Sequence, residues 1–160
     1  FNRCCIWFQG CNLNCKGCCN KDLQALIPNH IIDFDKLVEI VKEARDDFGI
    51  EGVTLSGGEP SLQKGLVDFN KAIHDLGLGI IMFSGRSKDA LNPELVNSVD
   101  LLIDGPFIES ELDTDRVLLG SKNKNLTFIT DRYESEADYF NNPVSIEEIT
   151  AEDYIFINGD

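Results

Sequence analysis

The sequence predicts one α/β domain, spanning residues 1–160, that is built around a mainly parallel β-sheet. Short apolar stretches alternate along the chain with amphipathic stretches of helical length. Strands that alternate with helices are joined by right-handed crossovers and lie parallel to one another. The apolar run "LGIIMF" at 78–83 lacks polar alternation, which is typical of a parallel strand buried on both faces.

Four strands and three helices are expected in the part of the chain that ends at residue 105. The strands are expected where β-branched and aromatic residues are enriched, at 4–10, 52–58, 78–85 and 99–105. The helices are expected where apolar residues recur at helical spacing, at 35–48, 61–77 and 91–98. Asp33 or Asp35 can cap the first helix, and Gly49 can end it.

The remainder of the chain is less regular. One short strand is expected at 126–129 and a last strand at 153–159. Six strands are therefore expected in all. Ligands of such sheets bind at the carboxyl ends of the strands. Three loops are therefore expected to line one active rim: 9–20, 56–60 and 84–86.

The composition argues against nucleic acid and membranes as partners. The formal net charge is −14 at pH 7, whereas proteins contact phosphate groups and anionic lipid surfaces through lysine and arginine. No apolar run reaches about 18 residues, so no membrane-spanning helix is expected. Solubility explains the acidity, and a face that attracts a basic protein partner is the alternative.

All six cysteines lie in the stretch "CCIWFQGCNLNCKGCCN" at residues 4–20. A disulfide framework links distant segments, so this crowding favours metal ligation in a reducing cytoplasm. Cys11, Cys15 and Cys18 form a C-x3-C-x2-C motif, which brings three soft sulfur ligands to one loop. A structural zinc site needs a fourth protein ligand. Three further cysteines could supply it: Cys4, Cys5 and Cys19. Cys4 and Cys5 lie in the first expected strand, where free cysteine behaves as a small buried hydrophobe, and Trp7 of the same strand is expected in the core.

The tract "SGGEP" at 56–60 follows the second expected strand. Gly57 and Gly58 allow the backbone to approach a ligand closely. Glu59 places a carboxylate where it can accept a hydrogen bond from an ammonium group, and Pro60 can begin a helix without losing a hydrogen bond. The alternative is an ordinary strand-to-helix turn in which Glu59 only favours the helix dipole.

The cysteine motif after the first strand and "SGGEP" after the second together resemble the radical S-adenosylmethionine (SAM) superfamily. The resemblance implies an incomplete (β/α)6-type radical SAM barrel and a [4Fe–4S] cluster held by Cys11, Cys15 and Cys18. In this family the iron without a protein ligand binds SAM, and an electron from the cluster cleaves SAM to methionine and a 5′-deoxyadenosyl radical. Such a cleavage needs the low end of iron–sulfur potentials.

The resemblance also implies SAM-binding residues on the same loops. The tract 56–60 binds the amino group of SAM, and "FSGR" at 83–86 lies near its ribose and carboxylate. An aspartate that ends the fourth strand helps to hold SAM or a cation in relatives, although an Asp-Gly turn explains this residue equally well. Cys19 belongs to the wall around SAM, because a fourth thiolate would close the open iron site. The predicted SAM-binding residues are Gly17, Cys19, Asn20, Ser56, Gly57, Gly58, Glu59, Ser84, Gly85 and Asp104.

Two longer tracts resemble one subgroup, the activating proteins of glycyl radical enzymes. They are "WFQGCNLNCKGCCN" and "IDGPFIESELDTDRVLLGSKNKNL", and they are most similar to the short activase of anaerobic ribonucleotide reductase. There are departures from its pattern. Leu119 replaces an arginine, Lys124 and Asn125 replace glutamine and arginine, and Cys19 stands where an aromatic residue or histidine is common.

This resemblance implies an oxidoreductase that abstracts a hydrogen atom from a glycine α-carbon of a large partner and leaves a stored glycyl radical. The expected partner is a glycyl radical enzyme, first of all the large subunit of an anaerobic ribonucleotide reductase. A flavodoxin or ferredoxin is the expected electron donor, and an anaerobic cytoplasm the expected location. Two alternatives stay open: a small radical SAM enzyme that modifies a peptide or small molecule, and a metal-binding module without enzymatic activity.

Overall fold

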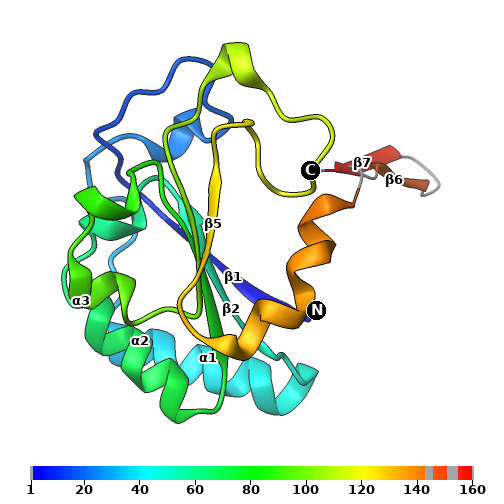
Figure 1. The fold of residues 1–160 in the computed structure, drawn as a ribbon. Coiled ribbons are helices and arrows are strands. Elements are labelled where there is room, and N and C mark those ends of the chain that lie inside the picture. The colour runs from blue at the N-terminus through cyan, green and yellow to red at the C-terminus, as the bar shows by residue number, and fades with distance from the viewer. Residues whose placement is uncertain (1, 143–145, 151–154, 160) are drawn as a thin grey trace.

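The computed structural model describes residues 2–142, 146–150 and 155–159. Its main sheet has five strands in the order β1-β2-β3-β4-β5 (Figure 1). Strands β1 to β4 are parallel, and β5 runs antiparallel to β4. The expected α/β class with a mainly parallel sheet is therefore confirmed. The strands are β1 (Arg3–Phe8), β2 (Gly52–Gly57), β3 (Gly79–Phe83), β4 (Leu101–Asp104) and β5 (Asn125–Phe128).

Three α-helices connect the parallel strands and cover one face of the sheet (Figure 1). They are α1 (Phe34–Phe48), α2 (Leu66–Asp75) and α3 (Pro93–Val96). As expected, α1 ends at Gly49, which adopts the left-handed conformation with φ 61°. The second helix is shorter than expected, because Pro60–Leu62 forms a separate 3-10 turn and left-handed Gly65 precedes α2. Within the described residues, no helix has the length and apolar character that crossing a membrane requires.

Apolar side chains pack on both faces of the main sheet. The larger core lies under the helices and includes Val41, Leu55, Phe69, Ile80 and Met82. On the opposite face the 3-10 helix Asp131–Asn141 covers part of the sheet. The buried residues of this second core are Ile81, Leu101, Ile103, Leu119, Tyr133 and Phe140. The second core thus lies over β3 and β4. Arg3 at the start of β1 reaches it by donating a hydrogen bond to the Tyr133 hydroxyl at 2.5 Å, whereas Cys5 and Trp7 farther along β1 are exposed.

Strand β1 lies at the edge of the sheet, and one of its faces is exposed from Cys5 to Trp7. Trp7 is 54% exposed, and Cys5 is exposed as well. The expectations that Trp7 is a core residue and that Cys5 is a small buried hydrophobe are therefore wrong. Side chains alternate along a strand, so Ile6 and Phe8 pack against the helix-side core while Trp7 points to the exposed side.

The expected last strand forms outside the main sheet. β7 (Ile155–Gly159) pairs antiparallel with β6 (Ile146–Thr150) in a two-stranded sheet of their own. The interpretation of 153–159 as a sixth strand of the barrel is corrected accordingly, and residues 153 and 154 lie outside the described part. A partner strand a few residues away requires less loop-closure entropy than a distant sheet edge does, and the pattern of a single strand carries no information about its partner.

Asp100 joins three segments at the start of β4 and is almost fully buried. Its carboxylate accepts hydrogen bonds from Ile80 N–H at 2.7 Å and Thr130 Oγ1–H at 2.6 Å. His74 Nε2 lies 3.0 Å from Asp100 Oδ2. Burial by itself raises the pKa of Asp100, but the hydrogen bonds from these three groups outweigh burial and hold the pKa below its usual value.

Replacing Asp100 by asparagine is expected to lower the free energy of unfolding by about 1–3 kcal/mol at pH 7, because a buried network loses its ionised acceptor. A carboxylate with a lowered pKa stabilises the folded state above its unfolded pKa, and this contribution is lost as the pH falls through the folded pKa. The difference between wild type and Asp100→Asn should therefore shrink between pH 7 and about pH 3, as measured by urea unfolding. Asp131→Asn removes the same charge at an exposed position, and an equal loss there would contradict the prediction.

Candidate functional site

The loops after β1 and β2 meet at the carboxyl edge of the sheet, as the ends of neighbouring parallel strands must. We call residues 9–20 the cysteine loop and residues 56–60 the glycine loop. The Asn20 amide Nδ2–H donates to Gly57 O at 3.0 Å and ties the end of the cysteine loop to the glycine loop. In Figure 1 the chain that follows β1, drawn in blue, lies at this end of the sheet.

Backbone hydrogen bonds join the two loops closely. Gly58 N–H donates to Phe8 O at 2.8 Å, and Glu59 N–H donates to Gly10 O at 2.9 Å. A Cβ atom on Gly58 would lie 2.4 Å from Gly10 O, a distance that real Cβ contacts do not reach. Glycine at this position is therefore required by the approach of the two backbones. The sequence had attributed Gly58 to the approach of a ligand.

The three motif cysteines, Cys11, Cys15 and Cys18, are free and half-buried on the cysteine loop. Cys18 N–H donates to Cys15 O at 3.3 Å and closes a turn between them. Over the part of the chain that the structure describes, no three histidine, cysteine, aspartate or glutamate side chains converge as metal ligands do. The chemistry of the donor set, three uncommitted thiols on one loop, nevertheless fits an iron–sulfur cluster. Cys19 is exposed, and burial raises the pKa of Cys4, which therefore stays a neutral thiol.

Glu59 lies at the centre of the candidate site and has no exposed surface. Its carboxylate accepts hydrogen bonds from Ser61 N–H at 3.1 Å, Ser84 Oγ–H at 3.0 Å and Gly85 N–H at 2.9 Å. Three predicted site residues, Glu59, Ser84 and Gly85, are thus brought together by direct contact. A carboxylate has about four acceptor positions, and protein groups fill three of them here.

Asp104 ends β4 and is 2% exposed. Its Oδ2 accepts a hydrogen bond from Lys88 N–H at 2.8 Å, and its Oδ1 is buried without a hydrogen-bond partner among the described residues. An unsatisfied buried oxygen of this kind is rare in folded proteins. Ser56, the remaining predicted residue of the glycine loop, lies at the end of β2 opposite Trp7 of β1.

Lys124 also belongs to this site. In the sequence it stood out only as a departure from the activase pattern. Its ammonium group donates to Ser84 O at 3.2 Å and to Gly105 O at 2.5 Å. Burial lowers the pKa of Lys124, and nearby acidic groups act in the opposite direction. These acidic groups are Cys15, Glu59, Asp104 and Cys19. The sequence did contain a signal for this residue: a lysine in a tract that otherwise resembles a cofactor-binding family.

Residues 106–122 lie against the cysteine loop. Lys16 Nζ pairs with Glu109 Oε2 at 2.8 Å. A Cβ atom on Gly17, which has φ 75°, would lie 2.8 Å from Glu109 Oε1. A hollow beside this contact is lined by Lys16, Phe107, Ile108, Glu109 and Ser110. Figure 1 shows the same segment, in yellow-green, at the end of the sheet that carries the cysteine loop.

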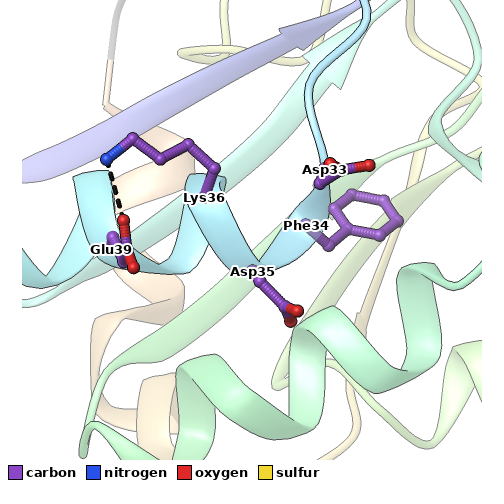
Figure 2. A pocket seen from close by; sticks show the side chains of 5 residues that line it. All are labelled: Asp33, Phe34, Asp35, Lys36 and Glu39. Carbon is purple, nitrogen blue, oxygen red and sulfur yellow. Dashed lines mark hydrogen bonds and ion pairs between the residues drawn. The ribbon is translucent and has the colours of Figure 1, made fainter.

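A second hollow lies at the start of α1, remote from the predicted site residues in sequence. Figure 2 shows its lining, Asp33, Phe34, Asp35, Lys36 and Glu39. Lys36 Nζ donates to Glu39 Oε2 at 2.8 Å, and the Phe34 ring stacks on Phe69 with 5.0 Å between centroids. These contacts stabilise the first turn of the helix and its packing on α2. The residues that line this hollow therefore serve the packing of α1, and we assign no ligand to it.

Comparison with known proteins points to iron–sulfur chemistry. The family model of the 4Fe-4S single cluster domain matches residues 2–127. The anaerobic ribonucleoside-triphosphate reductase-activating protein of Escherichia coli strain K12 is 29% identical in an alignment 133 residues long that covers 76% of this chain and 85% of that protein. Its counterpart in Haemophilus influenzae is 27% identical in an alignment of the same length that covers 76% of this chain and 84% of that protein. GTP 3′,8-cyclase of Clostridium perfringens strain 13 is 39% identical over 67 residues, 41% of this chain and 20% of the cyclase.

Proposed function

Because this chain belongs to the 4Fe-4S single cluster domain family, we propose that it is a radical SAM enzyme that generates a glycyl radical on an anaerobic ribonucleotide reductase. The extent of the similarity carries this proposal. The alignment with the activating protein of Escherichia coli covers 85% of that protein, whereas the alignment with GTP 3′,8-cyclase covers 20% of the cyclase. Similarity over nearly a whole protein extends to surfaces that a shared cofactor motif does not include.

In this proposal Cys11, Cys15 and Cys18 hold a [4Fe–4S] cluster, and Cys19 stays outside the ligand set. When bound, the cluster and SAM supply the one-electron cleavage of a sulfonium, which no amino-acid side chain provides. The chain's own residues would hold and orient these two groups. The backbone of the glycine loop would hold the amino end of SAM, and Glu59 keeps Ser84 and the following amide in position through its hydrogen bonds.

We further propose that residues 1–160 form a single domain whose sheet is an incomplete radical SAM barrel. The partner segment that carries the radical glycine would enter beside β1, and the exposed Trp7 and Cys5 on this side support that route. A side left open in this way suits a protein substrate, which brings its own surface to cover the site. A flavodoxin or ferredoxin supplies the electron.

Anaerobically reconstituted protein is expected to contain one [4Fe–4S] cluster and to release 5′-deoxyadenosine from SAM under dithionite. Incubation with an anaerobic ribonucleotide reductase should then produce the doublet of a glycyl radical in the electron paramagnetic resonance (EPR) spectrum. Iron analysis, chromatography of the nucleoside and the EPR spectrum are the three measurements. A reductase whose radical-bearing glycine is replaced by alanine is the matched control and should show no doublet.

Two outcomes would contradict this function in different ways. A colourless zinc protein that leaves SAM intact would exclude a radical SAM enzyme. Cleavage of SAM without a radical on any glycyl radical enzyme tested would favour the alternative, a peptide or small molecule as substrate. The shorter alignment with GTP 3′,8-cyclase, a protein named for a small-molecule substrate, makes that the alternative to test next.

A further inference from the structure

Lys124 reaches into the centre of the candidate site from a segment remote in sequence. Its ammonium group donates to the carbonyl of Ser84, 40 residues away, and to that of Gly105, 19 residues away. These carbonyls follow β3, which pairs with β2, the strand of the glycine loop, and β4, the next strand in the sheet order. An ammonium group has three donors, so two fixed carbonyls leave one N–H for a further group.

The acidic groups near Lys124 come from separate loops. Cys15 and Cys19 belong to the cysteine loop, Glu59 to the glycine loop and Asp104 to the end of β4. Glu59 and Asp104 are both buried, and Asp104 Oδ1 has no hydrogen-bond partner among the described residues. A half-buried cation close to buried carboxylates acts through a lower dielectric than a surface cation does.

Two other cations lie near the cysteine loop, and both differ from Lys124. The Lys16 side chain is 90% exposed and pairs with Glu109. Arg86 donates to Asn12 Oδ1 in an exposed hydrogen bond. Solvent and salt screen exposed charges strongly, so neither side chain compensates the buried acidic groups as Lys124 does.

We propose that Lys124 is a positioning residue whose fixed positive charge favours the reduced state of the cluster held by the cysteine loop. This inference rests on the proposed function. Net charge and nearby hydrogen bonds set the potential of an iron–sulfur cluster. Reduction adds one negative charge beside carboxylates that already disfavour it, and the ammonium group offsets this repulsion. The pattern that the chain otherwise resembles has glutamine at position 124 and arginine at position 125, so a cation at position 124 itself is a property of this chain.

The competing interpretation is that Lys124 only links the loops after β3 and β4 through its hydrogen bonds to two carbonyl oxygens. Lys124→Gln separates the two interpretations, because an amide keeps two N–H donors but carries no charge. Lys124→Arg keeps the charge. Lys122→Gln removes the same charge from an exposed side chain two residues away and is the matched control.

The experiment is an anaerobic redox titration of the reconstituted proteins, followed by the EPR signal of the reduced cluster. For Lys124→Gln we expect the ratio of reduced to oxidised cluster at a fixed potential to fall about tenfold, which corresponds to a shift of about −59 mV for one electron. Lys124→Arg and Lys122→Gln should stay close to wild type. Circular dichroism of the apo-proteins checks that each variant is folded.

Each outcome decides the role of Lys124. An unchanged potential in Lys124→Gln would overturn the inference and leave the proposed function standing, whereas a wild-type protein that binds no cluster would overturn the proposed function itself. If Lys124→Gln folds but binds no cluster, normal cluster binding by Lys124→Arg would support a role for the positive charge. Loss of binding in both variants would overturn the inference in favour of the structural tie.

Discussion

Replacement of Cys11, Cys15 or Cys18 by alanine, one at a time, is expected to abolish cluster binding and SAM cleavage. Three thiols on one loop act as one chelating unit, so the loss of any one of them leaves a cluster with too few protein ligands. Iron analysis and the absorbance of the reconstituted variants measure the loss of the cluster. The release of 5′-deoxyadenosine should fall to the level of a reaction without protein.

The adjacent Cys19 provides the matched control. Cys19→Ala changes the same atoms at a neighbouring exposed position, and this variant should keep the cluster. Circular dichroism of the apo-proteins should be the same in all four variants, because the motif thiols are not part of either core. Loss of the cluster in Cys19→Ala together with its retention in Cys18→Ala would overturn the ligand assignment.

Substitution of Gly58 by alanine is expected to have the second largest effect. The added methyl group would lie 2.4 Å from Gly10 O and 2.9 Å from Leu23 O. Both are backbone atoms that cannot rotate away, so the cysteine loop must move and the hydrogen bond from Glu59 N–H to Gly10 O must lengthen. Overpacking of this kind lowers the free energy of unfolding by about 1–3 kcal/mol. Urea unfolding measures this loss, and iron content after reconstitution should fall with it.

Gly49→Ala separates a local effect on the site from a general loss of stability. Gly49 is left-handed at the end of α1, and a Cβ there meets nothing within 4 Å. Its substitution should lower stability by about 1–2 kcal/mol through backbone conformation alone. Iron content should then be unchanged in Gly49→Ala and reduced in Gly58→Ala. Equal iron content in the two variants would show that contact between the loops does not support cluster binding.

Most elements of the fold could be predicted because their signals are local. The apolar runs predicted β1 to β4. The helical periodicity, bounded by Asp33 and Gly49, predicted α1 to within two residues. The separate pairing of β7 could not be predicted, because a strand's own residues do not identify its partner. The exposure of Trp7 was also beyond the sequence, since it depends on which part of the sheet the 3-10 helix Asp131–Asn141 covers.

The candidate site shows the same division. The spacing of Cys11, Cys15 and Cys18 and the tract 56–60 indicated both loops and the edge on which they meet. Their roles as ligands stay predictions. The burial of Glu59 and its three hydrogen bonds were not visible in the sequence, which treated this carboxylate as open to an ammonium group.

Local signals in the sequence were enough to predict the α/β class, the positions of the four parallel strands and the loop that carries the thiols. Periodicity, glycine positions and ligand spacing act over a few residues, so they can be recognised from the sequence alone. The folded protein alone reveals that Gly58 faces the backbone of Gly10 and that Lys124 reaches Ser84 across 40 residues. Packing and charge act between segments that the chain separates, and folding is what brings them within range of one another.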